Sequence, residues 1–147
     1  MSGNLVGIAR ACEIGAPLEE LGAAAISVDR GIAGDARGAK RNRQVTVLFR
    51  DGWEDACRDA GAELHWMVRR ANLLLANLER PREPGGTLCI GQVELHVTME
   101  TQPCHLMDRA FEGLRRALRP DWRGGVCCIV RKAGEIRLGD SVDYLRP

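Results

Sequence analysis

Apolar residues recur with two different periods along the chain, and each period predicts a different kind of element. Short runs that alternate with polar residues, or that are continuously apolar, predict strands when turn residues bound them. The expected strands are residues 5–9, 25–28, 44–49, 87–90, 93–99, 126–130, 135–138 and 141–144. Between residues 64 and 78 the pattern is ambiguous: it fits a helix up to Val68, and residues 72–75 fit a buried strand.

Two stretches with apolar residues three and four positions apart predict amphipathic helices. The first has Asp51 at the expected N-cap and Gly61 at the expected stop, and the second runs from about residue 107 to 118, before Pro120. A chain with many short strands and few helices is typical of a mainly β fold. We therefore expect a closed or nearly closed β-barrel with a few helical insertions.

Length and charge narrow the classes of function. At 147 residues, the chain is expected to form one domain, residues 1–147. The formal net charge is +1, so no strong field points to nucleic acid or to a membrane as a partner. Almost all the positive charge is arginine, with Lys40 and Lys132 as the lysines. Arginine suits the recognition of anions, and a GC-rich genome is the alternative explanation for its frequency.

The chain has six cysteines, and their context argues against disulfides. The first residues lack the basic and apolar regions of a secretory signal, and no apolar run approaches the length of a membrane span. We therefore expect a cytoplasmic protein with reduced thiols. No Cys-x-x-Cys pair occurs, so a structural zinc site is not expected.

Cys104 is the cysteine best placed for chemistry. It lies between the end of an expected strand and the start of an expected helix, where the helix dipole favours a thiolate. A thiolate binds soft metals or carries sulfur as a persulfide, whereas the alternative is a small core residue. The neighbouring His105 is expected at the surface or as a cap. Packing roles are expected for Cys12, Cys57 and Cys89.

A glycine-rich loop, residues 31–38, is the second candidate, together with Arg41 and Arg43. Successive backbone N–H groups in such loops can bind an anion, and arginines add forked donors for phosphate. The alternative is a tight barrel corner in which Asp35 bonds its own turn.

Two further arginine-containing segments are candidates for pocket residues. Arg69, Arg70 and Asn72 interrupt an apolar stretch, so their side chains either extend outwards or line a pocket. Arg123 precedes a second glycine-rich turn, which is another possible anion site.

These segments, in this order, resemble the MOSC domain family, named after the C-terminal domain of molybdenum cofactor sulfurase. The matching motifs are Gly31-x-x-Gly34-Asp35, Arg43-Gln44-Val45-Thr46-Val47-Leu48, Asn72 with the following aliphatic residues, Leu88-x-Ile90-Gly91 through Leu95-x-Val97-Thr98, Pro103-Cys104, Gly125-Val126, and Gly134-x-Ile136-Arg137-Leu138-Gly139-Asp140-x-Val142. The resemblance spans nearly the whole chain, which looks like a small stand-alone member.

The resemblance implies a MOSC β-barrel, of the pyruvate-kinase-barrel type, and binding of the molybdenum cofactor (molybdopterin) or sulfur transfer. Cys104 corresponds to the family cysteine, as the catalytic residue and metal ligand. The cofactor-binding residues implied are Gly34, Asp35, Arg43, Asn72 and Arg123. A cysteine desulfurase or a redox protein is the implied partner.

The chain departs from the family pattern at two positions. Arg37 stands where many members have a histidine, and Ala71 where an acidic residue often precedes the asparagine. Three functions follow as hypotheses. The first is a domain that binds the molybdenum cofactor or carries sulfur. The second is a molybdenum-dependent reductase of N-hydroxylated compounds, with external electron donors. The third is a binding domain that has lost the cofactor.

Overall fold

The computed structural model describes residues 2–147. Its strands are β1 (Ser2–Arg10), β2 (Glu19–Glu20), β3 (Ala23–Ser27), β4 (Gly31–Ile32), β5 (Val45–Phe49), β6 (Leu73–Ala76), β7 (Thr87–Ile90), β8 (Val93–Glu100), β9 (Val126–Lys132), β10 (Gly134–Arg137) and β11 (Ser141–Leu145). Its helices are α1 (Arg50–Ala60), α2 (His105–Ala110) and α3 (Leu114–Leu118), with 3-10 turns η1 (Trp66–Arg69) and η2 (Pro120–Trp122).

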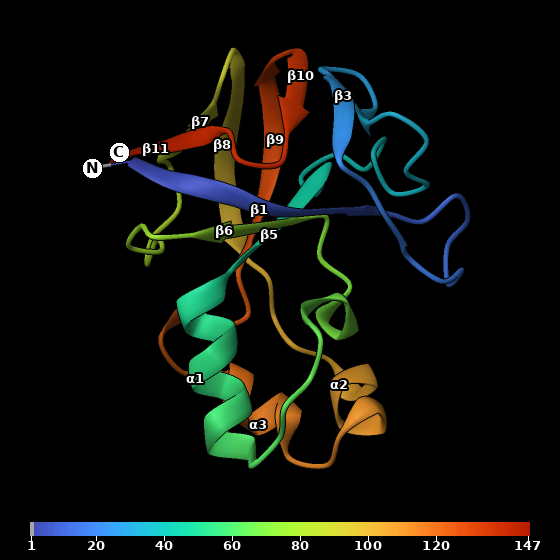
Figure 1. Cartoon of the computed structure of the whole chain (residues 1–147), viewed down its shortest axis with the longest axis vertical. Helices are drawn as coiled ribbons and strands as arrows, with labels where there is room; N and C mark the ends of the chain where they lie inside the picture. The colour runs from blue at the N-terminus through green and yellow to red at the C-terminus, as the bar shows by residue number, and fades with distance from the viewer. Residues whose placement is uncertain (1) are drawn as a thin grey trace.

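Seven strands close into a mixed β-barrel in the order β11-β7-β8-β9-β5-β6-β1, with β1 pairing back to β11. Only the β5–β6 pair is parallel among these neighbours. The short β2 extends the end of β1, and β10, β3 and β4 form a separate sheet. Figure 1 shows this small sheet beside the barrel wall. The predicted mainly β barrel with few helices is confirmed.

The interior of the barrel is filled by the side chains that point inwards from each strand. Along β8, buried Val93, Leu95 and Val97 alternate with partly exposed residues, as the period of two requires. The two adjacent cysteines of β9 therefore point in opposite directions. Cys128 lies in the barrel core, whereas the Cys127 sulfur lies 3.3 Å from the Thr101 hydroxyl, outside that core cluster.

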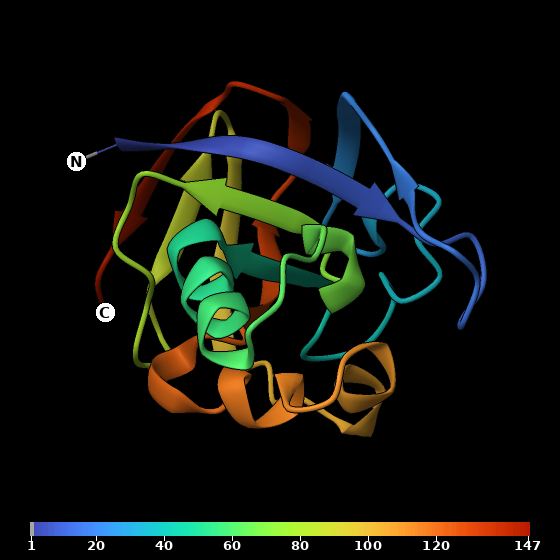
Figure 2. The ribbon, with the colours of Figure 1, turned by 60° about the horizontal axis from the view of Figure 1, so that its bottom comes forward.

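The three helices cover one end of the barrel, below the strands in Figure 1 and at the front in Figure 2. They bury a second apolar cluster that joins Trp53 of α1 with Leu114 and Leu118 of α3. No helix in residues 2–147 combines the length and the hydropathy needed to cross a membrane.

Three expectations about local structure were wrong. The predicted helix over residues 107–118 is two helices, because Phe111 is extended and Gly113 adopts a positive φ of 92°. Asp51 lies in the first turn of α1, and Phe49 occupies the N-cap position without a side-chain cap. Cys12 is exposed instead of packed. The strand expected at 72–75 is present as β6, and the helix stop at Gly61 is confirmed by its φ of 76°.

Candidate functional site

Cys104 is exposed at the junction between the end of β8 and the start of α2. It is the extended N-cap residue of α2, and its carbonyl accepts the Met107 N–H at 3.0 Å. The expected junction is therefore present. Since α2 has only six residues, its dipole is a weak source of positive potential, and the surrounding side chains decide the electrostatics.

A cavity of about 220 Å³ opens beside this cysteine, and we call it the Cys104 cavity. Four arginines from two loops line it: Arg37 and Arg43 from the segment before β5, and Arg69 and Arg70 from the end of η1. The other lining residues are Thr46, Val47, Ala71, Thr101, Gln102, Cys104, Leu106, Met107 and Gly124. None of these lining residues is an aspartate or a glutamate.

Arg69 is the most buried of the four arginines, with 8% of its surface exposed. Its Nε donates to the Gly124 carbonyl at 3.1 Å, and its Nη2 donates to the Thr101 carbonyl at 2.9 Å. Gly124 permits this approach, because a Cβ there would lie 2.5 Å from the Thr101 oxygen and 3.2 Å from Arg69 Nη2. Arg69 is thus fixed between the ends of β8 and β9.

Burial lowers the pKa of the Arg69 guanidinium to about 10, and the like charge of Arg43 acts in the same direction. The anionic forms of Cys104 and Cys127 act in the opposite direction. Neutral carbonyls are its hydrogen-bond partners, so its charge is not balanced by a carboxylate in residues 2–147. An anion in the cavity would supply the missing countercharge.

Arg37 and Arg70 are held by similar neutral contacts. Arg37 Nη2 donates to the Arg70 carbonyl at 3.1 Å, and Arg70 Nη2 donates to the Ala16 carbonyl at 2.6 Å. Burial lowers the pKa of Arg37; Asp35 opposes this effect, and the like charges of Arg70 and Arg43 add to it. The cavity therefore gathers positive charges that repel one another.

The structure places the predicted cofactor residues in different environments. Arg43 and Cys104 line the same cavity. Asn72 is 1% exposed, and its Oδ1 accepts from the Thr46 N–H and hydroxyl while its Nδ2 donates to the Ala9 carbonyl. Asn72 therefore ties β1 to β5 from beneath the site.

Arg123 is held between two helices. Its Nη1 pairs with Asp59 of α1 at 2.7 Å and donates to the Ala117 carbonyl, so it joins α1 to α3. It is not among the residues that line the Cys104 cavity. This placement indicates a structural role in linking the helices.

Gly34 and Asp35 lie at the corner after β4 and are also absent from the cavity lining. Asp35 Oδ1 accepts the Ala11 N–H at 3.0 Å, and its buried Oδ2 has no hydrogen-bond partner in the described residues. A Cβ on Gly34 would lie 2.8 Å from Arg10 Nη1. Both residues shape the corner that carries Arg37 to the site.

A metal held by protein side chains alone is not supported. No group of three or more His, Cys, Asp or Glu residues with suitable geometry occurs within residues 2–147. A metal whose other ligands come from a bound cofactor needs only one protein ligand, and the exposed sulfur of Cys104 meets that requirement.

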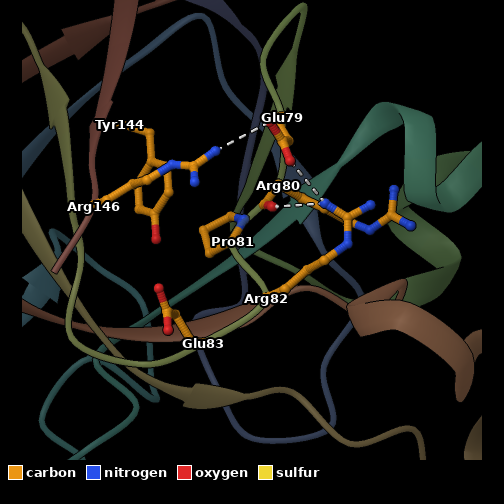
Figure 3. A pocket seen from close by; sticks show the side chains of 7 residues that line it. All are labelled: Glu79, Arg80, Pro81, Arg82, Glu83, Tyr144 and Arg146. Atoms are coloured by element: carbon orange, nitrogen blue, oxygen red, sulfur yellow. Dashed lines mark hydrogen bonds and ion pairs between the residues drawn. The ribbon is translucent and has the colours of Figure 1, made fainter.

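A second hollow of about 240 Å³ lies beside the C-terminal strand, and Figure 3 shows its lining. Here the arginines are paired: Glu79 lies between Arg82 and Arg146, at 3.3 and 3.4 Å. Arg80 reaches Asp51 and Asp121 at 3.1 and 2.9 Å. We call these residues the paired cluster. Their mutual ion pairs leave little unbalanced charge for a ligand.

The comparisons with known proteins agree with the fold and the motifs. The family model described as the MOSC domain matches residues 34–143. The chain belongs to the MOSC domain family. A search of curated proteins finds no match to this MOSC domain.

Solved structures show the same architecture at low sequence identity. YuaD from Bacillus subtilis is 14% identical, with a TM-score of 0.85 over 100% of this MOSC domain and 98% of YuaD. YiiM from Escherichia coli is 13% identical, with a TM-score of 0.75 over 100% of this chain and 71% of YiiM. YiiM from Geobacillus stearothermophilus is 15% identical, with a TM-score of 0.69 over 98% of this chain and 73% of that YiiM. At these identities the likeness establishes the fold alone.

Both departures from the MOSC pattern, Arg37 and Ala71, line the Cys104 cavity. The sequence marked Arg69 and Arg70 as a polar interruption of an apolar stretch, but their role in this cavity depends on contacts with distant carbonyls. Thr101 and Gln102, two to three residues before Cys104, gave no chemical signal of their own.

Proposed function

We propose that this MOSC domain binds the molybdenum cofactor in the Cys104 cavity, with Cys104 as the sulfur ligand of the metal. The observation that supports it best is the combination of an exposed cysteine with four arginines and no lining carboxylate. The cofactor is an anion that carries a phosphate, and arginine donors suit phosphate. The residues present therefore fit the group.

Each side chain has a definite part in this proposal. Cys104 presents its sulfur at the mouth of the cavity, and the cofactor, when bound, supplies a metal centre for redox or sulfur chemistry. Arg43 and Arg70, which line the cavity, would bind the cofactor phosphate. Arg69 contributes a fixed, poorly screened positive charge deeper in the cavity. Asn72 supports the floor through Thr46.

Sulfur transfer is a second candidate for the same site. It is favoured by the exposure of Cys104, because a persulfide carrier must reach the sulfur donor and the acceptor. The donor is proposed to be the cysteine persulfide of a cysteine desulfurase: the Cys104 thiolate would attack its outer sulfur, the S–S bond of the donor would break, and the desulfurase cysteine would leave as a thiolate. An anionic persulfide would face the same arginines as the cofactor.

The test is the metal and pterin content of the protein, purified from a host that makes the cofactor. We expect near-stoichiometric molybdenum and pterin in the wild-type protein and loss of molybdenum in Cys104→Ala. Cys12→Ala is the matched control, because Cys12 is also exposed but does not line the cavity. Wild-type protein without molybdenum or pterin would contradict cofactor binding. A sulfur adduct on Cys104 after incubation with a desulfurase would then support the carrier function.

A further inference from the structure

The segment before β5 carries three basic residues at a spacing of three: Arg37, Lys40 and Arg43. Two turn hydrogen bonds order this segment, because Lys40 N–H donates to the Arg37 carbonyl and Arg43 N–H donates to the Lys40 carbonyl. All three residues border one small space. We call these three residues the basic ridge.

The basic ridge lines a separate small space. This narrow hollow has a volume of about 40 Å³ and is bounded by Arg37, Lys40, Arg43, Thr46 and Asn72. One water occupies roughly 10–15 Å³ by the same kind of measure, so the hollow admits a group of several heavy atoms. Arg37, Arg43 and Thr46 also line the Cys104 cavity, so the two spaces share a wall.

The lining of these two spaces is positively charged in the described residues 2–147. Five cations border them, and no carboxylate is among the lining residues. The carboxylate that acts on Arg37 is Asp35, whose Oδ1 is engaged by the Ala11 N–H. Arg37 and Arg43, which border both spaces, repel each other, and an anion bound beside them would relieve that repulsion.

We propose that the narrow hollow is a second anion subsite, which binds a phosphoryl group next to the one held in the Cys104 cavity. The ligand of the whole site would then carry a diphosphate, with Arg37 and Arg43, which border both spaces, contacting both phosphoryl groups and Lys40 contacting the far one. Arg37 and Lys40 are the specificity-determining residues. The inference rests on the proposed function only for the identity of the molecule that carries the diphosphate.

The test compares the binding of inorganic pyrophosphate and inorganic phosphate to the purified full chain, by calorimetry at constant ionic strength. We expect pyrophosphate to bind at least about tenfold more tightly than phosphate. In Lys40→Ala this preference should fall by about tenfold, because the far phosphoryl group loses its cation. Lys40 is exposed, so the variant is expected to fold normally.

Arg41→Ala is the matched control. Arg41 is the next residue, is also exposed and lines neither space, so its removal changes the net charge equally. The preference of the Arg41→Ala variant for pyrophosphate over phosphate should stay within about twofold of that of the wild-type protein. Equal affinities for the two anions in the wild-type protein, or equal effects of the two substitutions, would overturn the subsite.

Two further measurements separate this inference from the proposed function and identify the molecule that carries the diphosphate. Cys104→Ala should keep the pyrophosphate preference even though it loses molybdenum, so either proposal can fail alone. Acid treatment of protein from a cofactor-producing host should release a nucleoside monophosphate with the pterin if the diphosphate belongs to a dinucleotide form of the cofactor. A preference for pyrophosphate without such release assigns the subsite to a free diphosphate ester.

Discussion

Arg69 and Arg80 are both buried guanidinium groups, but the structure treats their charges differently. Arg80, with 4% of its side chain exposed, pairs with Asp51 and Asp121. Arg69, with 8% of its surface exposed, bonds only to the carbonyls of Thr101 and Gly124. A buried charge without a countercharge costs free energy, whereas a paired one holds elements together. The comparison separates a region built for stability from one suited to an external anion.

The same contrast extends to the neighbours of each arginine. In the paired cluster, hydrogen bonds from Arg82 hold the pKa of Asp121 below its ordinary value. In the Cys104 cavity, burial lowers the pKa of Arg37, Asp35 opposes this effect, and the like charges of Arg70 and Arg43 add to it. Ion pairs hold the arginines of the paired cluster, whereas burial and like charges act on those of the Cys104 cavity, so matched substitutions in the two regions should have different consequences.

The largest expected difference is between the two buried arginines. Arg80→Met should lower the free energy of unfolding by about 2–4 kcal/mol, because it removes a buried cation with two ion pairs. The lowering of the pKa of Arg69 to about 10 corresponds to roughly 3 kcal/mol of unfavourable charge burial at neutral pH. Arg69→Met relieves that cost but loses two hydrogen bonds, so its net effect should be less than half as large. Urea denaturation of both variants measures their free energies of unfolding. Equal losses of stability in the two variants would contradict the comparison.

Smaller effects on the free energy of unfolding, opposite in sign to each other, are expected for substitutions of two exposed arginines. Arg43→Ala should raise the free energy of unfolding by about 0.5 kcal/mol at low salt, because Arg43 repels Arg37 and Arg69. Arg82→Ala should lower it by about 0.5 kcal/mol, because Arg82 pairs with Asp121 and Glu79. Both effects should shrink at about 0.5 M salt, where exposed charges are screened. Thermal unfolding at two salt concentrations would show whether the signs differ.

Much of the fold followed from the sequence because a strand in a barrel has one buried face. The alternation of β8 and the apolar run of β9 predicted those strands within a few residues. The helix after Cys104 was harder, because Met107, Leu114 and Leu118 keep a helical spacing across a break at Gly113. A pattern of apolar side chains does not reveal a change of backbone direction.

The candidate site was predictable only in part. The sequence indicated Cys104 and Arg43, and these line one cavity. It also indicated Arg123 as a cofactor residue, but Arg123 meets Asp59, a residue 64 positions away, and joins two helices. Whether an arginine bonds a carboxylate or faces a cavity depends on such distant contacts. Local sequence therefore identified candidate arginines without separating the paired from the unpaired ones.

The central claim is that Cys104 faces an unbalanced positive cavity that attracts anions. The most direct test compares alkylation by iodoacetate, an anion, with alkylation by iodoacetamide, its neutral analogue. The quantity measured, by mass spectrometry at each cysteine, is the iodoacetate rate divided by the iodoacetamide rate. Exposed Cys12 in the same molecule is the internal reference. We predict a ratio about tenfold higher at Cys104 than at Cys12, as expected for one nearby partly screened charge, and a fall toward the Cys12 value in Arg43→Ala. The same ratio at both cysteines would contradict the account.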